Sequence, residues 1–271
     1  MIRRLVFFVL VLLPYMIVCI PVQFVATRLN LPGWALLPRG FHKLACWFLG
    51  LRVTVIGRPE TRRPTLLVSN HISWTDIIAI GSVADVTFVA KSEIDAWPVV
   101  GFMASLQKTI YVDRTKKGAA RRTSAEMASR LADGGAVLLF AEGQSDTGTH
   151  VLPFRSALVG SAQAAMVEAG AADVVIQPMA VAYTRLQGLP LSRNERSQIF
   201  WVKSKSVKQN IRDILTGGIK DVVVAFGTPM ELDHGADRKA VTKKCENKVR
   251  HMLVALNRGL PLGEIGAHRT L

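Results

Sequence analysis

Two residues that follow an apolar run could carry acid–base chemistry. The stretch "LLVSNHISWTD", residues 66–76, contains His71 and Asp76, which lie five positions apart. A histidine can accept a proton near neutral pH, and a neighbouring carboxylate can fix its tautomer and leave the other ring nitrogen free. The pair therefore predicts a general base with an orienting partner, although a loop histidine beside an ordinary helix cap has the same spacing.

The spacing restricts how His71 and Asp76 can meet. On one continuous helix, side chains five residues apart point about 140° away from each other. We therefore expect His71 to lie in a loop and a helix to begin near Ser73, a residue type that caps helices. Asp76 then falls in the first helical turn, where an acidic side chain is favourable.

Further polar residues stand at the ends of other apolar runs. Glu142 and Gly143 follow one run, and Lys91 and Arg114 each end another. In open α/β sheets, reactive residues gather at the edge where strands end and helices begin. We take these four residues as candidates for a site shared with His71.

The elements that must position these residues alternate between strands and helices. Short apolar runs bounded by turn residues predict strands, and small or amphipathic stretches predict the helices between them. Pro178 lies inside one strand and lacks an N–H, so it predicts an edge strand or a bulge. The expected strands are 51–57, 65–70, 86–91, 109–114, 136–143, 174–183 and 221–230, and the expected helices include 121–135, 154–170 and 237–257.

No repeat period and no Gly/Ser linker divides the chain after residue 50. Strands that alternate with helices predict an α/β fold. We expect residues 51–271 to form a single α/β domain, in which a mixed sheet is covered by helices.

The first 50 residues differ from the rest of the chain. Two arginines precede an uncharged apolar run at 5–27, and a second, amphipathic segment follows at 40–51. The run is long enough to span a bilayer core, which takes about 20 residues. Pro14 and Pro21 are expected to interrupt its helix. We therefore expect residues 1–50 to form a helical segment that dips into one leaflet and returns, with a single spanning helix as the alternative.

The overall charge points to an anionic partner. The chain has 271 residues and a formal net charge of +14. Nucleic acid and an acidic membrane surface are the two obvious anionic partners, and the apolar N-terminus favours the membrane. We therefore expect a membrane partner and no nucleic acid. The three cysteines have no zinc or disulfide spacing, so we expect a reducing compartment and no metal site.

Four blocks together resemble a known family. "NHISWTD", "TIYVDR", "FAEGQS" and "VVIQPMAVAY" occur in the same order as in the glycerolipid acyltransferases that acylate lysophosphatidic acid, and the similarity runs from about residue 51 to 230. The resemblance implies that His71 is the catalytic histidine of an HX4D motif and that Asp76 is its partner. It implies that Arg114 contacts the phosphate of the acceptor, and that Glu142 and Gly143 help to bind the acceptor.

The third block departs from the family pattern. It usually reads Glu-Gly-Thr-Arg, whereas this chain has Gln144 and Ser145 after Gly143. An arginine recognises phosphate with two parallel hydrogen bonds, which Gln and Ser cannot copy. The flanking sequence is similar to the bacterial branch that acylates lyso-ornithine lipid, whose head group carries no phosphate. Alternatively, Arg155 supplies the missing charge.

The resemblance implies a membrane-associated O-acyltransferase of bacterial lipid biosynthesis. It would move a fatty acyl group from acyl-CoA or acyl carrier protein to the hydroxyl of a lysolipid, without a cofactor. The acceptor would be lyso-ornithine lipid or 1-acylglycerol-3-phosphate, and the enzyme would lie on the cytoplasmic face of the inner membrane. The two rival interpretations are a lipid hydrolase with a nucleophilic serine and a non-catalytic membrane adaptor.

Overall fold

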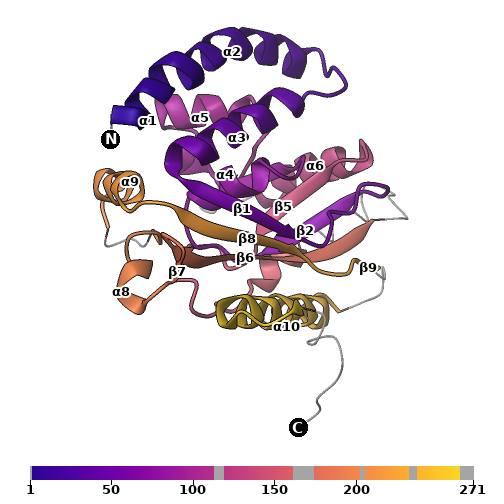
Figure 1. Cartoon of the computed structure of the whole chain (residues 1–271). Coiled ribbons are helices and arrows are strands. Elements are labelled where there is room, and N and C mark those ends of the chain that lie inside the picture. The colour runs from indigo at the N-terminus through magenta and orange to yellow at the C-terminus, as the bar shows by residue number, and fades with distance from the viewer. Residues whose placement is uncertain (1, 113–118, 161–173, 202–204, 232–236, 263–271) are drawn as a thin grey trace.

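A helical layer, a sheet and a second helical layer make up the fold, as the computed structural model shows (Figure 1). The structure describes residues 2–112, 119–160, 174–201, 205–231 and 237–262. The expected strand at 109–114 and the expected helix at 154–170 each lie partly outside these residues, and Arg114 lies outside them altogether.

The strands form one mixed sheet, as expected. They are β1 (Leu51–Ile56), β2 (Thr65–Ser69), β3 (Thr87–Lys91), β4 (Ile110–Val112), β5 (Ala136–Phe140), β6 (Val175–Leu186), β7 (Leu189–Pro190), β8 (Lys220–Phe226) and β9 (Met230–Glu231). The order is β1-β8-β6-β2-β5-β3-β4, with β7 and β9 also paired to β6. β2 is parallel to both β5 and β6, whereas β6 and β8 are antiparallel.

Helices cover both faces of this sheet. They are α1 (Ile2–Phe7), the π-helix η1 (Phe8–Leu12), α2 (Leu13–Arg28), α3 (Leu36–Leu49), α4 (Thr75–Gly81), the 3-10 helix η2 (Ser92–Ile94), α5 (Pro98–Ser105), α6 (Ala119–Ala132), α8 (Arg193–Arg196), α9 (Val207–Thr216) and α10 (Arg238–Arg258). One hydrophobic cluster joins α6 and α10 to the sheet, and a second joins α3, α4 and α9 to the other face.

β2 lies in the middle of the sheet and is buried along its whole length. Its apolar residues alternate between the two clusters, with Leu66 and Val68 on the α10 face and Leu67 on the α4 face. A strand that is buried on both faces reads as a continuous apolar run, which is why this strand could be predicted from the sequence. His71 follows the carboxyl end of β2, so it lies where the parallel strands of the sheet end.

Pro178 was expected at an edge or a bulge. Its strand is not an edge strand, but a bulge-like irregularity is present, because residues 177–178 of β6 face the three residues 227–229 between β8 and β9. It lies in β6, opposite Val68 of β2, in the interior of the sheet. Its carbonyl accepts a hydrogen bond from the Gly227 N–H at 2.8 Å, so this side of its backbone faces the gap where β8 ends and β9 begins. The missing N–H of proline therefore falls where β6 changes partner.

The N-terminal residues form a long helix that folds back on α3 (Figure 1). Its helical residues run from Ile2 to Arg28, a stretch of 27 that is long and apolar enough to cross a membrane by length and composition. The helix continues through both Pro14 and Pro21, so the expected interruption is wrong. The π-helical turn η1 lies just before Pro14, and such wider turns accommodate local irregularities within α-helices.

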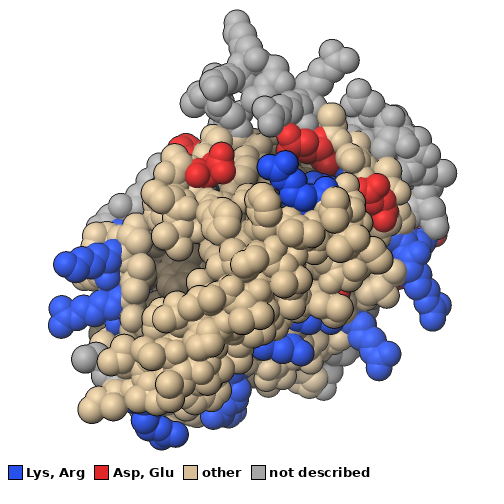
Figure 2. Space-filling view, turned by 90° about the horizontal axis from the view of Figure 1, so that it is seen from above, with Lys and Arg blue, Asp and Glu red and all other residues tan. Residues whose placement is uncertain are grey.

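The side of the molecule that carries α2 is largely uncharged. Figure 2 shows this face with Lys and Arg side chains mostly towards its margins and with a hollow that opens in the uncharged surface. Many large apolar side chains of α1, η1, α2 and α5 are exposed, with Val99 of α5 reaching 70% exposure. An exposed apolar surface of this extent is typical of a surface that contacts membrane or protein.

Candidate active site

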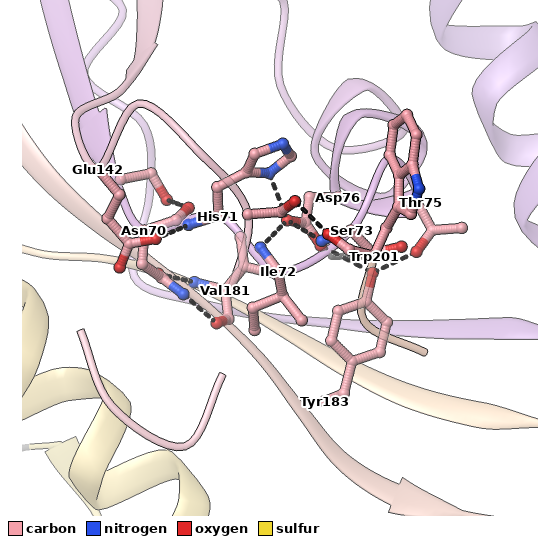
Figure 3. Close-up of polar contacts among 12 residues, drawn as sticks. Asn70, His71, Ile72, Ser73, Thr75, Asp76, Glu142, Val181, Tyr183 and Trp201 are labelled. Carbon is pink, nitrogen blue, oxygen red and sulfur yellow. Dashed lines mark hydrogen bonds and ion pairs between the residues drawn. The ribbon is translucent and has the colours of Figure 1, made fainter. Parts of the chain in front are cut away.

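His71 and Asp76 meet directly at the end of β2. The His71 Nδ1 and Asp76 Oδ2 atoms lie 2.9 Å apart, and the Asp76 side chain is fully buried whereas that of His71 is 19% exposed (Figure 3). His71 lies in the loop, and Asp76 lies in the first turn of α4, as the spacing predicted. Because the carboxylate accepts the Nδ1 proton, Nε2 is the ring nitrogen that remains free to accept another.

The Asp76 carboxylate accepts several further hydrogen bonds. Its Oδ2 atom accepts from the backbone N–H groups of Ile72 at 2.6 Å and Ser73 at 3.0 Å. Its Oδ1 atom accepts from the Tyr183 hydroxyl at 2.8 Å, and that hydroxyl lies 2.6 Å from Thr75 Oγ1. These hydrogen bonds fix the position of the Asp76 carboxylate beside the imidazole.

The expectation that Ser73 caps α4 is wrong. The helix begins at Thr75, its N-cap residue is Trp74, and no side chain caps it. The buried Ser73 hydroxyl has no hydrogen-bond partner among the described residues. Asp76 instead folds back on the two N–H groups that precede the helix, so the carboxylate that orients His71 also fixes the backbone of its loop.

Packing holds the His71 ring in place. The imidazole stacks on the ring of Phe140 from β5, with ring centroids 4.0 Å apart and an angle of 21° between the planes. The Asn70 side chain continues the ladder beyond β2, because it donates to the Val181 carbonyl at 3.0 Å and accepts from the Val181 N–H at 2.9 Å. The loop that carries His71 is thus attached to β6 on one side and to β5 on the other.

Glu142 also binds the loop that carries His71. It is buried, and its two carboxylate oxygens accept from the His71 and Leu152 N–H groups, each at 3.0 Å. Burial raises the pKa of Glu142 to about 8, against the opposing effect of those two N–H donors. Gly143 follows with a φ of +71°, a conformation that favours glycine. The observed contacts of Glu142 are with this chain's own backbone, so its side chain positions the His71 loop.

The remaining candidates for substrate binding are Lys91, Arg155 and Arg114. Lys91 is half-buried at the end of β3. Arg155 is exposed, and its Nε donates to the Glu142 carbonyl at 3.2 Å. Arg114 lies outside the described residues. The structure therefore brings Arg155 next to the Glu142 backbone and leaves Lys91 at the end of a neighbouring strand.

Sequence reasoning missed three residues that build the site: Asn70, Phe140 and Tyr183. Each of them ends an apolar run, and a polar or aromatic residue at that position is the signal that could have indicated them. Within the described residues, no group of three or more His, Cys, Asp or Glu side chains is arranged to hold a metal ion.

Comparisons with known proteins show which family this chain is similar to. A family model described as Acyltransferase matches residues 52–182. A lyso-ornithine lipid O-acyltransferase from Brucella abortus is 41% identical over 245 residues, which cover 89% of this chain and 91% of that protein. A protein of the same name from Rhizobium meliloti is 38% identical, with coverage of 90% of this chain and 83% of that protein.

More distant similarity extends to enzymes with another acceptor in their name. A 1-acyl-sn-glycerol-3-phosphate acyltransferase from Neisseria gonorrhoeae is 34% identical over 51% of this chain and 52% of that protein. The crystal structure of the 1-acyl-sn-glycerophosphate (LPA) acyltransferase PlsC from Thermotoga maritima superposes with a TM-score of 0.59 at 20% identity, covering 100% of this chain and 99% of that chain. At that identity the likeness shows the shared fold alone.

Proposed function

Since this chain belongs to the acyltransferase family and acts on lysolipids, we propose that it acylates lyso-ornithine lipid with a His71–Asp76 general base. The observation that carries the mechanism is the 2.9 Å contact between His71 Nδ1 and a fully buried Asp76 carboxylate. The donor is an acyl thioester, either acyl-CoA or acyl carrier protein, and no cofactor takes part.

The proposed mechanism is direct transfer in one active site. His71 Nε2 takes the proton of the acceptor hydroxyl while the hydroxyl oxygen attacks the thioester carbonyl. The carbon–sulfur bond then breaks, and the departing thiolate takes the proton from the imidazolium. Asp76 stabilises the imidazolium and keeps the ring oriented, as in a catalytic triad without the enzyme-borne nucleophile. General-base catalysis is worth about 10²–10⁴-fold, and holding the two substrates together supplies the remainder.

The third block supports an acceptor without phosphate. Gln144 and Ser145 replace the arginine expected for phosphate recognition, and the Ser145 hydroxyl donates to the Trp201 carbonyl. Ser145 is therefore engaged in holding this loop. A second candidate acceptor is 1-acylglycerol-3-phosphate, which the Neisseria relative's name and the exposed Arg155 beside Glu142 favour.

The N-terminal helices support association with a membrane. Their apolar side chains face outward on the uncharged side of the molecule (Figure 2), and the net charge of +14 favours an anionic lipid surface. We propose that α1 to α3 dip into one leaflet of the inner membrane and that the catalytic domain lies on its cytoplasmic side. A single spanning helix is the alternative arrangement.

The proposal is tested by offering the purified protein both acceptors in parallel, each with acyl-CoA and with acyl carrier protein. Initial rates are expected to be at least about tenfold higher with lyso-ornithine lipid, the discrimination that one well-placed polar contact gives. A higher rate with 1-acylglycerol-3-phosphate would reverse the choice of acceptor. Release of free fatty acid without transfer would favour a hydrolase, and complete inactivity of all pairs would favour an adaptor.

A further inference from the structure

A second hollow lies beside the catalytic loop, and two arginines are among the residues that line it. Its volume is about 490 Å³, and it lies between residues 147–150 and the segment that carries α8. Arg193, Arg196 and His150 line it, together with the hydroxyls of Thr147 and Thr149. None of the lining residues in the described chain is Asp or Glu, but the Asp146 carboxylate lies behind two of them, 3.6 Å from His150 Nε2 and accepting from the Thr147 hydroxyl at 3.1 Å. The composition suits an anion that accepts several hydrogen bonds.

Both walls of this cationic pocket are fixed to the loop that carries His71. The Asp146 N–H donates to the His71 carbonyl at 2.9 Å, and the Trp201 N–H donates to the Ile72 carbonyl at 3.2 Å. The Ser145 hydroxyl, which donates to the Trp201 carbonyl, joins the two walls to each other. A ligand held in the pocket is thus positioned relative to the reacting imidazole by the backbone itself.

The two arginines are held differently. Arg196 is half-buried and anchored, because its guanidinium donates to the Gly148 carbonyl at 3.5 Å and to Asn257 Oδ1 at 3.1 Å. Arg193 is exposed and has no hydrogen-bond or ion-pair partner among the described residues. Because they are three residues apart on α8, the two side chains lie on the same side of it. Guanidinium groups recognise phosphate and carboxylate with paired hydrogen bonds.

The position of the pocket indicates from where its ligand arrives. α8 and α10 lie on one side of the sheet, whereas α2 lies on the other (Figure 1). The Arg196–Asn257 contact connects the pocket to the end of α10. A ligand in this pocket therefore comes from the water side of the molecule, away from the exposed apolar helices.

We propose that the cationic pocket binds the phosphate of the phosphopantetheine arm that carries the acyl thioester. Coenzyme A and acyl carrier protein share this arm, and both are soluble anions that approach from water. The proposal rests on the thioester donor in the proposed function. It adds a division of the site, in which the lipid acceptor comes from the apolar face and the donor's arm is held on the opposite face.

The test compares Arg193→Ala with wild type on three donors: acyl-CoA, acyl carrier protein and an acyl-N-acetylcysteamine thioester, which lacks the phosphate. The KM for each donor that carries the phosphate is expected to rise about tenfold at unchanged kcat, because the variant loses a charge-assisted hydrogen bond to the phosphate. The kcat/KM for the truncated donor is expected to stay the same. Arg62→Ala is the matched control, because Arg62 is an exposed arginine that precedes β2, at the opposite end of that strand from His71.

The outcomes separate this proposal from the proposed function. A rise in KM for every phosphate-bearing donor that the enzyme turns over, with the truncated donor unchanged, supports the pocket. If the enzyme turns over both acyl-CoA and acyl carrier protein, a rise for only one of them would overturn the shared arm as the ligand. An equal loss on the truncated donor, a rise in the KM of the acceptor alone, or no change in any KM would overturn the pocket's role. If wild type transfers no acyl group from any thioester, the proposed donor class fails first.

Discussion

The His71–Asp76 pair and the cations expected to bind substrate are held in opposite ways. Asp76 accepts hydrogen bonds from His71, from two backbone N–H groups and from Tyr183, and its side chain is fully buried. Arg155 and Arg193 are exposed and make few contacts. In the proposed mechanism, the chemistry would therefore depend on a buried and fixed geometry, whereas substrate recognition would depend on long, exposed side chains.

The largest expected effect on kcat comes from changing His71 or Asp76. His71→Ala and Asp76→Asn should each lower kcat by about 10³-fold, because both remove the oriented base. Ser73→Ala is the matched control, since the buried Ser73 hydroxyl has no partner among the described residues, and it should stay within about twofold of wild type, as an unpaired hydroxyl adds no stabilising bond. Near-normal kcat in either His71 or Asp76 variant would remove the mechanism, and inactivity of the Ser73 variant would point to a serine nucleophile.

Tyr183→Phe tests whether the hydrogen bond from Tyr183 of β6 to Asp76 contributes to kcat. It removes the donor to Asp76 Oδ1 and the contact with Thr75, while the ring volume is kept. We expect kcat to fall about tenfold at unchanged KM, which corresponds to about 1.4 kcal/mol. In the control Tyr111→Phe, which deletes a hydroxyl that donates to the Gly101 carbonyl at 3.2 Å, kcat should not fall. Equal losses in both variants would mean that Tyr183 acts through stability alone.

Glu142→Gln tests how Glu142, which holds the loop that carries His71, affects the unfolding free energy at different pH values. Burial raises the pKa of Glu142 from its ordinary 4.5 to about 8, so the folded protein keeps a proton that the unfolded chain loses. Its contribution to the unfolding free energy is fully present below pH 4.5, is lost as pH rises to 8, and is constant above that.

The measurement is denaturant unfolding of wild type and Glu142→Gln in detergent between pH 5 and 9. The unfolding free energy of the variant, relative to wild type, should increase up to about pH 8 and then level off, since glutamine does not titrate. Glu93→Gln removes an exposed carboxyl and serves as the reference for the change in net charge. Parallel curves for wild type and Glu142→Gln would contradict the raised pKa.

The smallest effect is expected at the exposed cation next to Glu142. Arg155→Ala should raise the KM for the lysolipid by about threefold, because water screens an exposed charge and limits such contacts to under about 1 kcal/mol. Arg155→Lys, which keeps the charge, should restore most of the difference. A hundredfold rise in KM would mean that Arg155 makes a strong contact with the lysolipid, and it would favour a phosphate-bearing acceptor.

The part of the site that the sequence predicted is the part made by near neighbours. His71 and Asp76 are five residues apart, and simple helix geometry was enough to place one in a loop and the other in the first turn of α4. The cap was mistaken because serine is a common cap, whereas here the Asp76 side chain takes the N–H groups of Ile72 and Ser73.

The remainder depends on contacts between residues far apart in the sequence. Tyr183 lies 107 positions from Asp76, and Val181 lies 111 positions from Asn70. These contacts follow from the order of strands in the sheet, which the apolar runs do not encode. The sequence could not choose between an edge and a bulge at Pro178 for the same reason, because the position at which β6 pairs first with β9 and then with β8 is a property of the whole sheet.

The junction between α3 and β1 has a mechanical consequence. α3 ends at Leu49 and β1 begins at Leu51, so the only residue between them is Gly50, whose φ is +70°. A one-residue joint leaves no slack, and added bulk there would meet the Gly218 carbonyl at 2.9 Å. In the proposed membrane association, any tilt of the N-terminal helices would therefore be transmitted through Gly50 to β1 and the sheet, because the junction has no spare residue to absorb it.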